Sequence, residues 1–211
     1  EGVKKVHAEY LAAGAQAIKT NTFGLPRMAA AQMPGWEELA EAGWKLACDA
    51  AAEKGAAVFA DLGPAPDTEA APARSAYGLV EAVKALRVAV PDAFVMVSFA
   101  VLPDGYTREG LLFRDLLRRM EQSGVVDAVG LNCVSAPGAM KKLVQSLGET
   151  LLPLSVMPNA GYPVVTRARV LYQGKPAYFA REMGQIAAAG VRILGGCCGT
   201  TPAHIFELSK I

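Results

Sequence analysis

The sequence predicts an α/β protein in which β/α units repeat around a parallel sheet. Short apolar or β-branched runs alternate along the chain with longer stretches of helical period, which is the pattern of such folds. The composition is that of an ordinary globular protein, with 52% hydrophobic and 19% charged residues. No linker, charge block, low-complexity tract or internal repeat separates two domains, so residues 1–211 are expected to form a single domain.

Six short apolar runs are expected to form the strands of the sheet. They cover residues 17–23, 57–62, 94–99, 128–132, 154–157 and 191–194. Polar residues crowd the end of the first run, Gly63 and Pro64 stop the second, and the third follows Pro91. Residues 63–76 are rich in Pro and Ala and show no periodicity, so no strand is expected there.

Stretches of helical period are expected to form the helices between these strands. They cover residues 3–13, 36–54, 77–90, 108–123, 138–147 and 177–189, with a last helix from Pro202. The apolar faces of the first two consist of Val6, Tyr10 and Leu11 and of Leu39, Ala40, Trp44, Ala47, Cys48 and Ala51. Gly14 closes the first helix, and Thr201 before Pro202 is the expected N-cap of the last. The stretch between residues 157 and 176 is expected to be a loop punctuated by Gly and Pro.

Charge and hydropathy exclude several classes of function. Lys and Arg number 21 against 20 Asp and Glu, and this formal net charge of +1 provides no basic field for nucleic acid or an anionic membrane. No apolar run reaches the roughly 18 residues of a membrane span, and residues 1–5 lack the apolar core of a signal peptide. The expected partner is therefore a small molecule, and the expected location is the cytoplasm.

Three of the four cysteines follow predicted strands. Cys133 comes directly after the fourth strand, and Cys197 and Cys198 follow the last strand through two glycines. Because the carboxyl ends of parallel strands meet at one edge of the sheet, the three thiols can converge there. Thiolate is a soft ligand suited to zinc, and three protein ligands leave a fourth position open. Cys48 instead lies on an apolar helix face, which is typical of a core cysteine.

Other interpretations of these side chains stay open. A vicinal disulfide between Cys197 and Cys198 is strained and disfavoured in a reducing cytoplasm, and the same pair can serve a thiol redox function. The three thiols can also be buried structural side chains. His204 falls in the first turn of the last helix, where a structural role is favoured over metal binding, and His7 lies within a helix, where packing or surface roles are favoured.

Two motifs carry a resemblance to a known family. The run Gly-Gly-Cys-Cys-Gly-Thr-Thr-Pro-Ala-His-Ile at 195–205, together with Gly-Leu-Asn-Cys at 130–133, resembles the zinc-binding signature of the homocysteine S-methyltransferase family. Residues 20–24, 61–64 and 158–163 match as well, so the resemblance covers nearly the whole chain. Within the family, the chain is similar to the homocysteine module of bacterial cobalamin-dependent methionine synthase and to methyltransferases fused to a methylenetetrahydrofolate reductase.

The resemblance implies a (β/α)8 barrel that binds zinc and transfers a methyl group to the thiol of homocysteine, which gives methionine. Cys133, Cys197 and Cys198 correspond to the zinc ligands, and the homocysteine sulfur, activated as a thiolate, corresponds to the fourth. The implied substrate contacts are Glu69, Thr22 and Asn21, and the residues expected to orient the metal site by hydrogen bonds are Asn132 and Asn159. The implied partner is a methyl donor or a methyl-carrier domain, with cobalamin or folate on another domain or protein.

Two parts of the family pattern have no counterpart in the sequence. The first is the opening strand, with its Asp-Gly segment and the Gly-Thr element after it, and the second is the third helix and fourth strand, missing between Pro66 and Thr68. The length agrees with these gaps, because the chain has 211 residues and a barrel of eight β/α units typically has about 250. The chain is expected to be an incomplete barrel from a longer protein. The alternative is a non-catalytic barrel that acts as an assembly or docking module of a larger methyltransferase.

Overall fold

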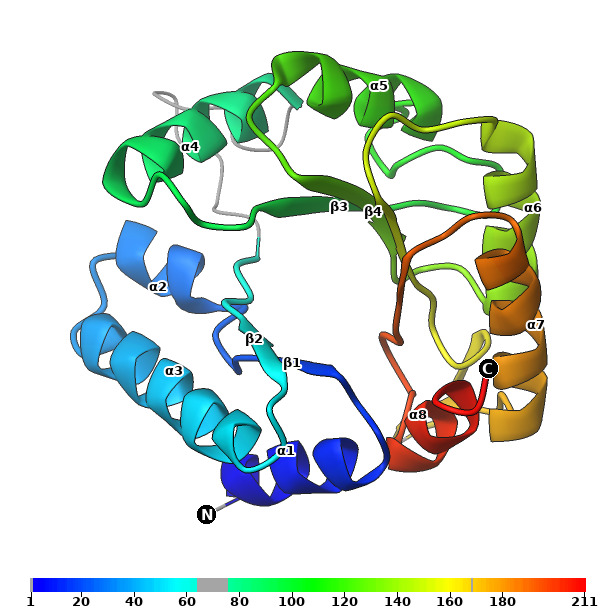
Figure 1. Cartoon of the computed structure of the whole chain (residues 1–211), viewed down its shortest axis with the longest axis horizontal. Helices are drawn as coiled ribbons and strands as arrows, with labels where there is room; N and C mark the ends of the chain where they lie inside the picture. Colours follow the sequence, from blue (N-terminus) through cyan, green and yellow to red (C-terminus); the bar gives the residue numbers. More distant parts are fainter. Residues whose placement is uncertain (1, 64–75, 168) are drawn as a thin grey trace. The chain divides into compact units, whose positions relative to one another are not determined.

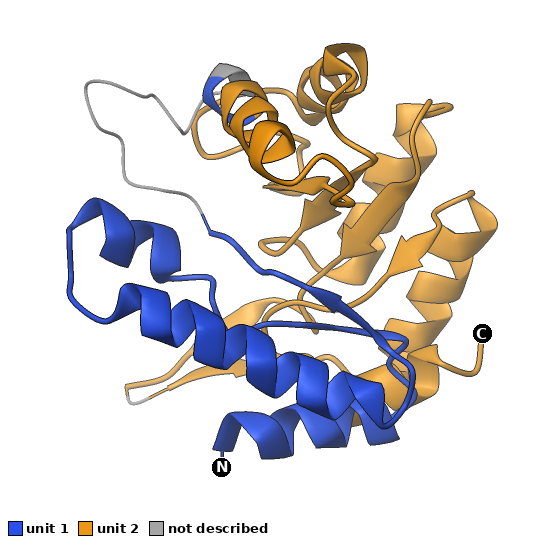
Figure 2. Cartoon of the chain, turned by 60° about the vertical axis from the view of Figure 1, so that its left-hand side comes forward, with its two compact units in different colours: residues 1–79 blue, residues 80–211 orange. Residues whose placement is uncertain are grey.

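The structure is a computed structural model that describes residues 2–63, 76–167 and 169–211. The chain groups into two compact units, residues 1–79 and 80–211, which Figure 2 shows in different colours. The boundary falls within helix α4 (Ala76–Ala89). The strands of the two units belong to separate sheets, and each unit is described by itself.

The first unit packs two helices against a pair of parallel strands. Its elements are α1 (Gly2–Ala12), β1 (Ala17–Lys19), α2 (Leu25–Ala30), α3 (Trp36–Ala52) and β2 (Ala57–Phe59). Strands β1 and β2 pair with Ile18 opposite Val58. The core cluster of this unit consists of Leu11, Ile18, Ala47, Ala50 and Ala51. The helical period of α3 therefore buries a face of small side chains against Ile18.

The apolar face predicted for α3 is only partly buried. Ala47 and Ala51 are in the core, but Leu39 and Trp44 are 52% and 48% exposed. Ala50, which was not on the predicted face, takes a place in the core instead. The buried face of α3 is therefore rotated slightly from the predicted face, which contains its largest apolar side chains. Alanines on the buried face allow α1 and α3 to approach more closely.

The second unit is built on a four-stranded parallel sheet in the order β3-β4-β5-β8. Its strands are β3 (Met96–Ala100), β4 (Ala128–Asn132), β5 (Leu154–Met157) and β8 (Ile193–Leu194), and its later helices are α5 (Phe113–Ser123), α6 (Pro137–Leu147), α7 (Pro176–Ala188) and α8 (Pro202–Leu208). Figure 1 shows α5, α6 and α7 along one side of this sheet. The first four residues of β4 are buried, as expected for a central parallel strand that is covered on both faces.

The carboxyl ends of the central strands share one edge of the sheet. Asn132, the last residue of β4, lies opposite Met157, the last residue of β5. Val156 in turn lies opposite Leu194, which ends β8. The segments that carry the three cysteines therefore leave the sheet from the same edge.

The segment before α7 is not the simple loop that the sequence predicts. It contains an antiparallel hairpin of β6 (Pro163–Val165) and β7 (Val170–Tyr172), with Val164 opposite Leu171. Its two strands, Pro-Val-Val and Val-Leu-Tyr, are only three residues long and lie between Gly161 and the Gly174–Pro176 segment, which is why they resemble a loop in the sequence.

Two other differences concern helices. Helix α2 was not expected, because six residues are too few to show a helical period. Helix α5 begins at Phe113 and not at residue 108, because Gly110 has a φ of +80° and Tyr106 and Leu112 form an antiparallel bridge around it. These residues form a turn that delays the helix.

The described residues therefore have an α/β fold with parallel sheets, as the sequence predicts at this level. None of their helices is long and apolar enough to cross a membrane. The stretch 64–75, which includes the predicted junction at Pro66 and Thr68, lies outside the described residues.

Candidate metal centre

Three thiols meet at the carboxyl edge of the four-stranded sheet. Cys133 follows β4 directly, and Cys197 and Cys198 come three and four residues after the end of β8. The Sγ atom of Cys198 lies 3.5 Å from that of Cys133 and 4.0 Å from that of Cys197, and all three sulfur atoms lie within 4.8 Å of one another. Cys133 and Cys197 are half-buried, whereas Cys198 is exposed. The structure thus brings together the three cysteines that the sequence singles out.

The spacing of these sulfur atoms fits a tetrahedral metal ion. A zinc ion with Zn–S bonds of about 2.3 Å holds pairs of sulfur ligands about 3.8 Å apart when the angles are tetrahedral. The two shorter separations, 3.5 and 4.0 Å, lie on either side of this value. All four cysteines of the chain are free thiols in the structure. Three soft donors are therefore already placed to hold a metal such as zinc and to leave a fourth position open.

The end of β5 and the segment that continues from it hold both cysteine loops in place. The backbone N–H of Cys133 donates to the carbonyl oxygen of Met157 at 3.0 Å, and that of Cys197 donates to the carbonyl oxygen of Pro158 at 2.8 Å. Two adjacent residues of one segment therefore fix the backbones of two cysteines that are 64 positions apart in the sequence.

Asn159, the next residue of this segment, fixes the third cysteine. Its Oδ1 atom accepts a hydrogen bond from the backbone N–H of Cys198 at 3.1 Å, and the N–H of Ala160 donates to the carbonyl oxygen of Cys198 at 2.9 Å. Asn159 is only 3% exposed, and its own N–H donates to the carbonyl oxygen of Ser135. Its side chain is thus held inside the protein while it orients Cys198.

The backbone at Cys133 is in a strained conformation. Cys133 and Val134 have φ values of +56° and +53°, a region that a β-branched residue such as Val134 rarely adopts. The fully buried Ser135 follows, and its hydroxyl donates to the carbonyl oxygen of Val101 at 2.8 Å. Strain of this kind persists only where surrounding contacts enforce it, and it concentrates at functional sites.

The proximity of the thiols changes how they ionise. A hydrogen bond with Cys197 lowers the pKa of Cys133 to about 5. The same hydrogen bond, together with burial, raises the pKa of Cys197. At neutral pH the metal-free cluster is therefore negatively charged at Cys133 and keeps a proton on Cys197, which a divalent cation must displace when it binds.

Tyr172, at the end of β7, lies against this cluster. Burial raises the pKa of its phenol, and a hydrogen bond to Cys198 and the charges of all three cysteines raise it further. A Cβ atom placed on Gly199, which has a φ of +77°, would lie 2.3 Å from both Cβ and Cγ of Tyr172. The base of the Tyr172 side chain therefore rests directly on the backbone that follows Cys198. Tyr172 is not predicted from the sequence, because the residues of the hairpin have the pattern of a loop.

His204 ties the cysteine loop to the segment before α7. The backbone N–H of Thr201 donates to Nδ1 of His204 at 3.2 Å, so Nδ1 is an acceptor and Nε2 carries the proton. Nε2 then donates to the carbonyl oxygen of Gly174 at 2.9 Å. Thr201 caps α8 and Pro202 starts it, as predicted, with His204 completing the capping box. The structural role expected of His204 is confirmed.

Of the remaining predicted residues, Asn132 directly precedes Cys133. Its Oδ1 atom accepts a hydrogen bond from the Ser98 hydroxyl at 2.7 Å. Thr22 and Asn21 belong to the first unit, where Asn21 is exposed and the buried Thr22 hydroxyl donates to the carbonyl oxygen of Asp61 at 2.9 Å and also contacts the hydroxyl of Thr20. Glu69 lies outside the described residues, and Cys48 is half-buried in α3.

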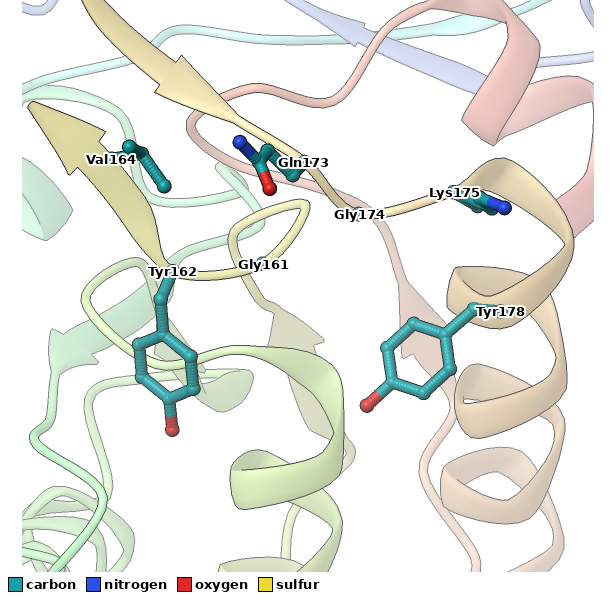
Figure 3. A pocket seen from close by; sticks show the side chains of 7 residues that line it. All are labelled: Gly161, Tyr162, Val164, Gln173, Gly174, Lys175 and Tyr178. Carbon is teal, nitrogen blue, oxygen red and sulfur yellow. The ribbon is translucent and has the colours of Figure 1, made fainter. Parts of the chain in front are cut away.

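A pocket of about 490 Å³ lies at the base of the β6–β7 hairpin, between the hairpin and α7 (Figure 3). Gln173 and Gly174, which lead from β7 into α7, form part of its lining, together with Tyr162 and Tyr178. A Cβ atom on Gly138, at the start of α6, would lie 3.0 Å from the phenol oxygen of Tyr178. The segment after Tyr172 therefore lines a pocket, while Tyr172 itself lies against Gly199.

Comparisons with known proteins agree with these motifs. The model of the family described as homocysteine S-methyltransferase matches residues 1–85 and 73–211. Methionine synthase of Mycobacterium tuberculosis is 32% identical over 251 aligned positions, which cover 98% of this chain and 21% of that protein. Homocysteine S-methyltransferase of Escherichia coli is 34% identical over 134 residues, which cover 63% of this chain and 43% of that protein. The chain thus spans less than half the length of these relatives.

Solved structures show the same likeness. The homocysteine methyltransferase MmuM of Escherichia coli is 26% identical, with a TM-score of 0.75 for its oxidized form and 0.72 for its metallated form. The metallated form is matched over 98% of this chain and 83% of that chain. The alignment with the mycobacterial methionine synthase is longer than the 211 residues of this chain, so that relative contains segments without counterparts here. With a family model matched along almost its entire length, the chain belongs to the homocysteine S-methyltransferase family.

Proposed function

We propose that this chain is the homocysteine-binding module of a zinc-dependent methyltransferase that converts homocysteine to methionine. The observation that carries the proposal is the group of three Sγ atoms within 4.8 Å of one another at the carboxyl edge of a parallel sheet. Relatives named methionine synthase and homocysteine S-methyltransferase support the substrate, and the metallated form of MmuM supports the metal.

The chain's own residues supply a prearranged site with one open position. Cys133, Cys197 and Cys198 provide three thiolate donors, and the hydrogen bond from the Cys198 backbone to Asn159 fixes the most exposed of them. Zinc, when bound, would lower the pKa of the homocysteine thiol so that the thiolate is present at neutral pH. The strained turn at Cys133 and the bonds to Met157 and Pro158 keep the donors from spreading, so little reorganisation is needed.

Other parts of the function follow from the family resemblance. We propose that Glu69, Thr22 and Asn21 contact the amino-acid part of homocysteine and that Asn132 supports the metal site through Ser98. Residues 1–211 would form one barrel domain of the (β/α)8 type. The methyl group would come from a donor or a methyl-carrier domain, with cobalamin or folate held on another domain or protein.

Zinc binding by the Cys133→Ser variant tests this proposal, with Cys48→Ser as the matched control. Both substitutions remove one thiol, but Cys48 lies half-buried in α3, in the other unit. Four-ligand zinc sites contribute 10–16 kcal/mol, or about 3 kcal/mol per ligand, so Cys133→Ser should weaken zinc binding by about 100-fold. Competition with a chromophoric chelator measures the affinity, and metal analysis measures the stoichiometry.

The same proteins then test the substrate. Loaded with Co²⁺ in place of zinc, the wild type should change its visible spectrum when homocysteine is added, and methionine should form from homocysteine and free methylcobalamin. Wild-type zinc affinity in Cys133→Ser would refute the metal site. A zinc-binding protein with no spectral response to homocysteine would instead favour the assembly or docking module.

A further inference from the structure

The pocket at the base of the β6–β7 hairpin is separate from the thiol cluster. It has a volume of about 490 Å³, which falls within the range of small-molecule sites in proteins. Among the described residues that line it, none is a cysteine and none is acidic, and all of them belong to the second unit. The proposed reaction leaves this pocket without an assigned ligand.

Two segments of backbone in direct contact form one part of the pocket. A Cβ atom on Gly174 would lie 1.6 Å from the carbonyl oxygen of Ala160, so only glycine fits at this position. The carbonyl oxygen of Gly174 accepts the hydrogen bond from Nε2 of His204 at 2.9 Å, and the N–H of Ala160 donates to the carbonyl oxygen of Cys198 at 2.9 Å. The protein's own contacts therefore fix this part of the pocket, as is typical of largely preformed ligand sites.

Two tyrosine side chains line the pocket from different elements. Figure 3 shows Tyr162, just before β6, and Tyr178, in α7, extending to the same side of the backbone at Gly161 and Gly174. The two tyrosines are 55% and 37% exposed. Aromatic rings pack favourably against one another in offset-stacked or edge-on arrangements. The pocket therefore offers aromatic surface to a planar ring from two elements.

The sequence around the pocket is positively charged. Residues 158–181 contain no acidic residue and four basic ones, which are Arg167, Arg169, Lys175 and Arg181. Lys175 lines the pocket and is exposed, and the guanidinium of Arg181 lies 5.2 Å from the centre of the Tyr178 ring. The next acidic residue, Glu182, is buried and paired with Lys141 at 2.6 Å and with Arg181 at 3.3 Å. An anionic ligand is therefore favoured over a cationic one.

We propose that this pocket is a binding site for a small aromatic carboxylate, whose ring packs against Tyr162 and Tyr178 and whose negative charge is attracted by Lys175. Binding needs both parts of the ligand, because the ring supplies the contact with the tyrosines and the carboxylate supplies the attraction to the ammonium group. The inference goes beyond the proposed function, since none of the residues that line the pocket is a proposed metal ligand or substrate contact.

Indole-3-acetate and indole-3-acetamide test the proposal, since the two probes share a planar ring and differ in the negative charge. The full chain is titrated with each probe, and ligand-observed NMR gives the dissociation constant. The wild type should bind the acid about three- to fivefold more tightly than the amide, as expected for one partly exposed ion pair. Lys175→Gln should remove this difference. Tyr162→Ala should weaken the binding of both probes by about tenfold, because it removes one aromatic contact.

Tyr106→Ala is the matched control, because Tyr106 is 44% exposed in the same unit but does not line the pocket. Tyr162 and Lys175 are exposed, so their substitution should leave the fold intact, which far-UV circular dichroism checks. Equal binding of the acid and the amide by the wild type would overturn the inference. So would the absence of measurable binding, or a loss in Tyr106→Ala as large as in Tyr162→Ala. These titrations do not depend on zinc, so failure of the pocket and failure of the proposed function are separate results.

Discussion

Replacement of His204 by Phe should destabilise the second unit by about 3 kcal/mol. His204 is 5% exposed and its ring stacks edge-on against Phe179 at 5.4 Å, so Phe preserves the shape but removes both nitrogen atoms. The loss of the capping acceptor for Thr201 costs about 1 kcal/mol. The carbonyl of Gly174, left without the Nε2 donor at 2.9 Å, adds about 2 kcal/mol. For a chain of this size, the melting temperature should fall by about 8 °C.

The other histidine of the chain provides the control. His7 is buried in α1 at 7% exposure, and within the described residues its Nε2 atom has no hydrogen-bond partner. His7→Phe therefore removes no bond at this atom and should cost less than 1 kcal/mol. Urea denaturation should be followed by far-UV circular dichroism, because both tryptophans, Trp36 and Trp44, belong to the first unit and their fluorescence reports only on it. A loss in His204→Phe no greater than in His7→Phe would contradict the role given to these hydrogen bonds.

Two further outcomes follow from the cysteine loop. Gly199→Ala should weaken zinc binding at least tenfold more than Gly190→Ala, as measured by chelator competition. Both glycines have a positive φ, but only Gly199 lies against Tyr172. Equal losses of zinc affinity in the two variants would show that this contact does not control the site. Zinc affinity should rise at least tenfold per pH unit near pH 7, because interaction with Cys133 and burial raise the pKa of Cys197 and zinc must displace at least this proton. Titration at several pH values checks this, and a flat profile would contradict it.

The sequence predicts the centre of the sheet better than its surroundings. The bounds of β4 and β5 agree with the prediction, because central parallel strands are apolar on both faces and end at polar or glycine- and proline-rich segments. The hairpin of β6 and β7 could not be predicted in this way. Its side chains are largely exposed, so its short runs carry no pattern of burial that distinguishes a strand from a loop.

The same contrast holds for the candidate site. Cys133, Cys197 and Cys198 can be selected from the sequence because they follow strands whose ends must share an edge. The supporting contacts cannot, since they depend on the three-dimensional path of the segment after β5 and of the hairpin. Tyr172 reaches Gly199, the residue after Cys198, only because β7 turns back on β6, and Gly174 reaches His204 only because α7 begins directly after the hairpin.

The residues that shape the thiol cluster and those proposed to bind the substrate belong to different units. Within the described part of the chain, Met157, Pro158, Asn159 and Ala160 hold the loops of the three cysteines by hydrogen bonds, and all four belong to residues 80–211. Thr22 and Asn21 belong to residues 1–79, and the Thr22 hydroxyl is engaged there with Asp61. Metal binding and substrate binding can therefore be lost separately. A variant of this chain that retains zinc has kept its second unit intact, and only a response to homocysteine shows that the first unit contributes.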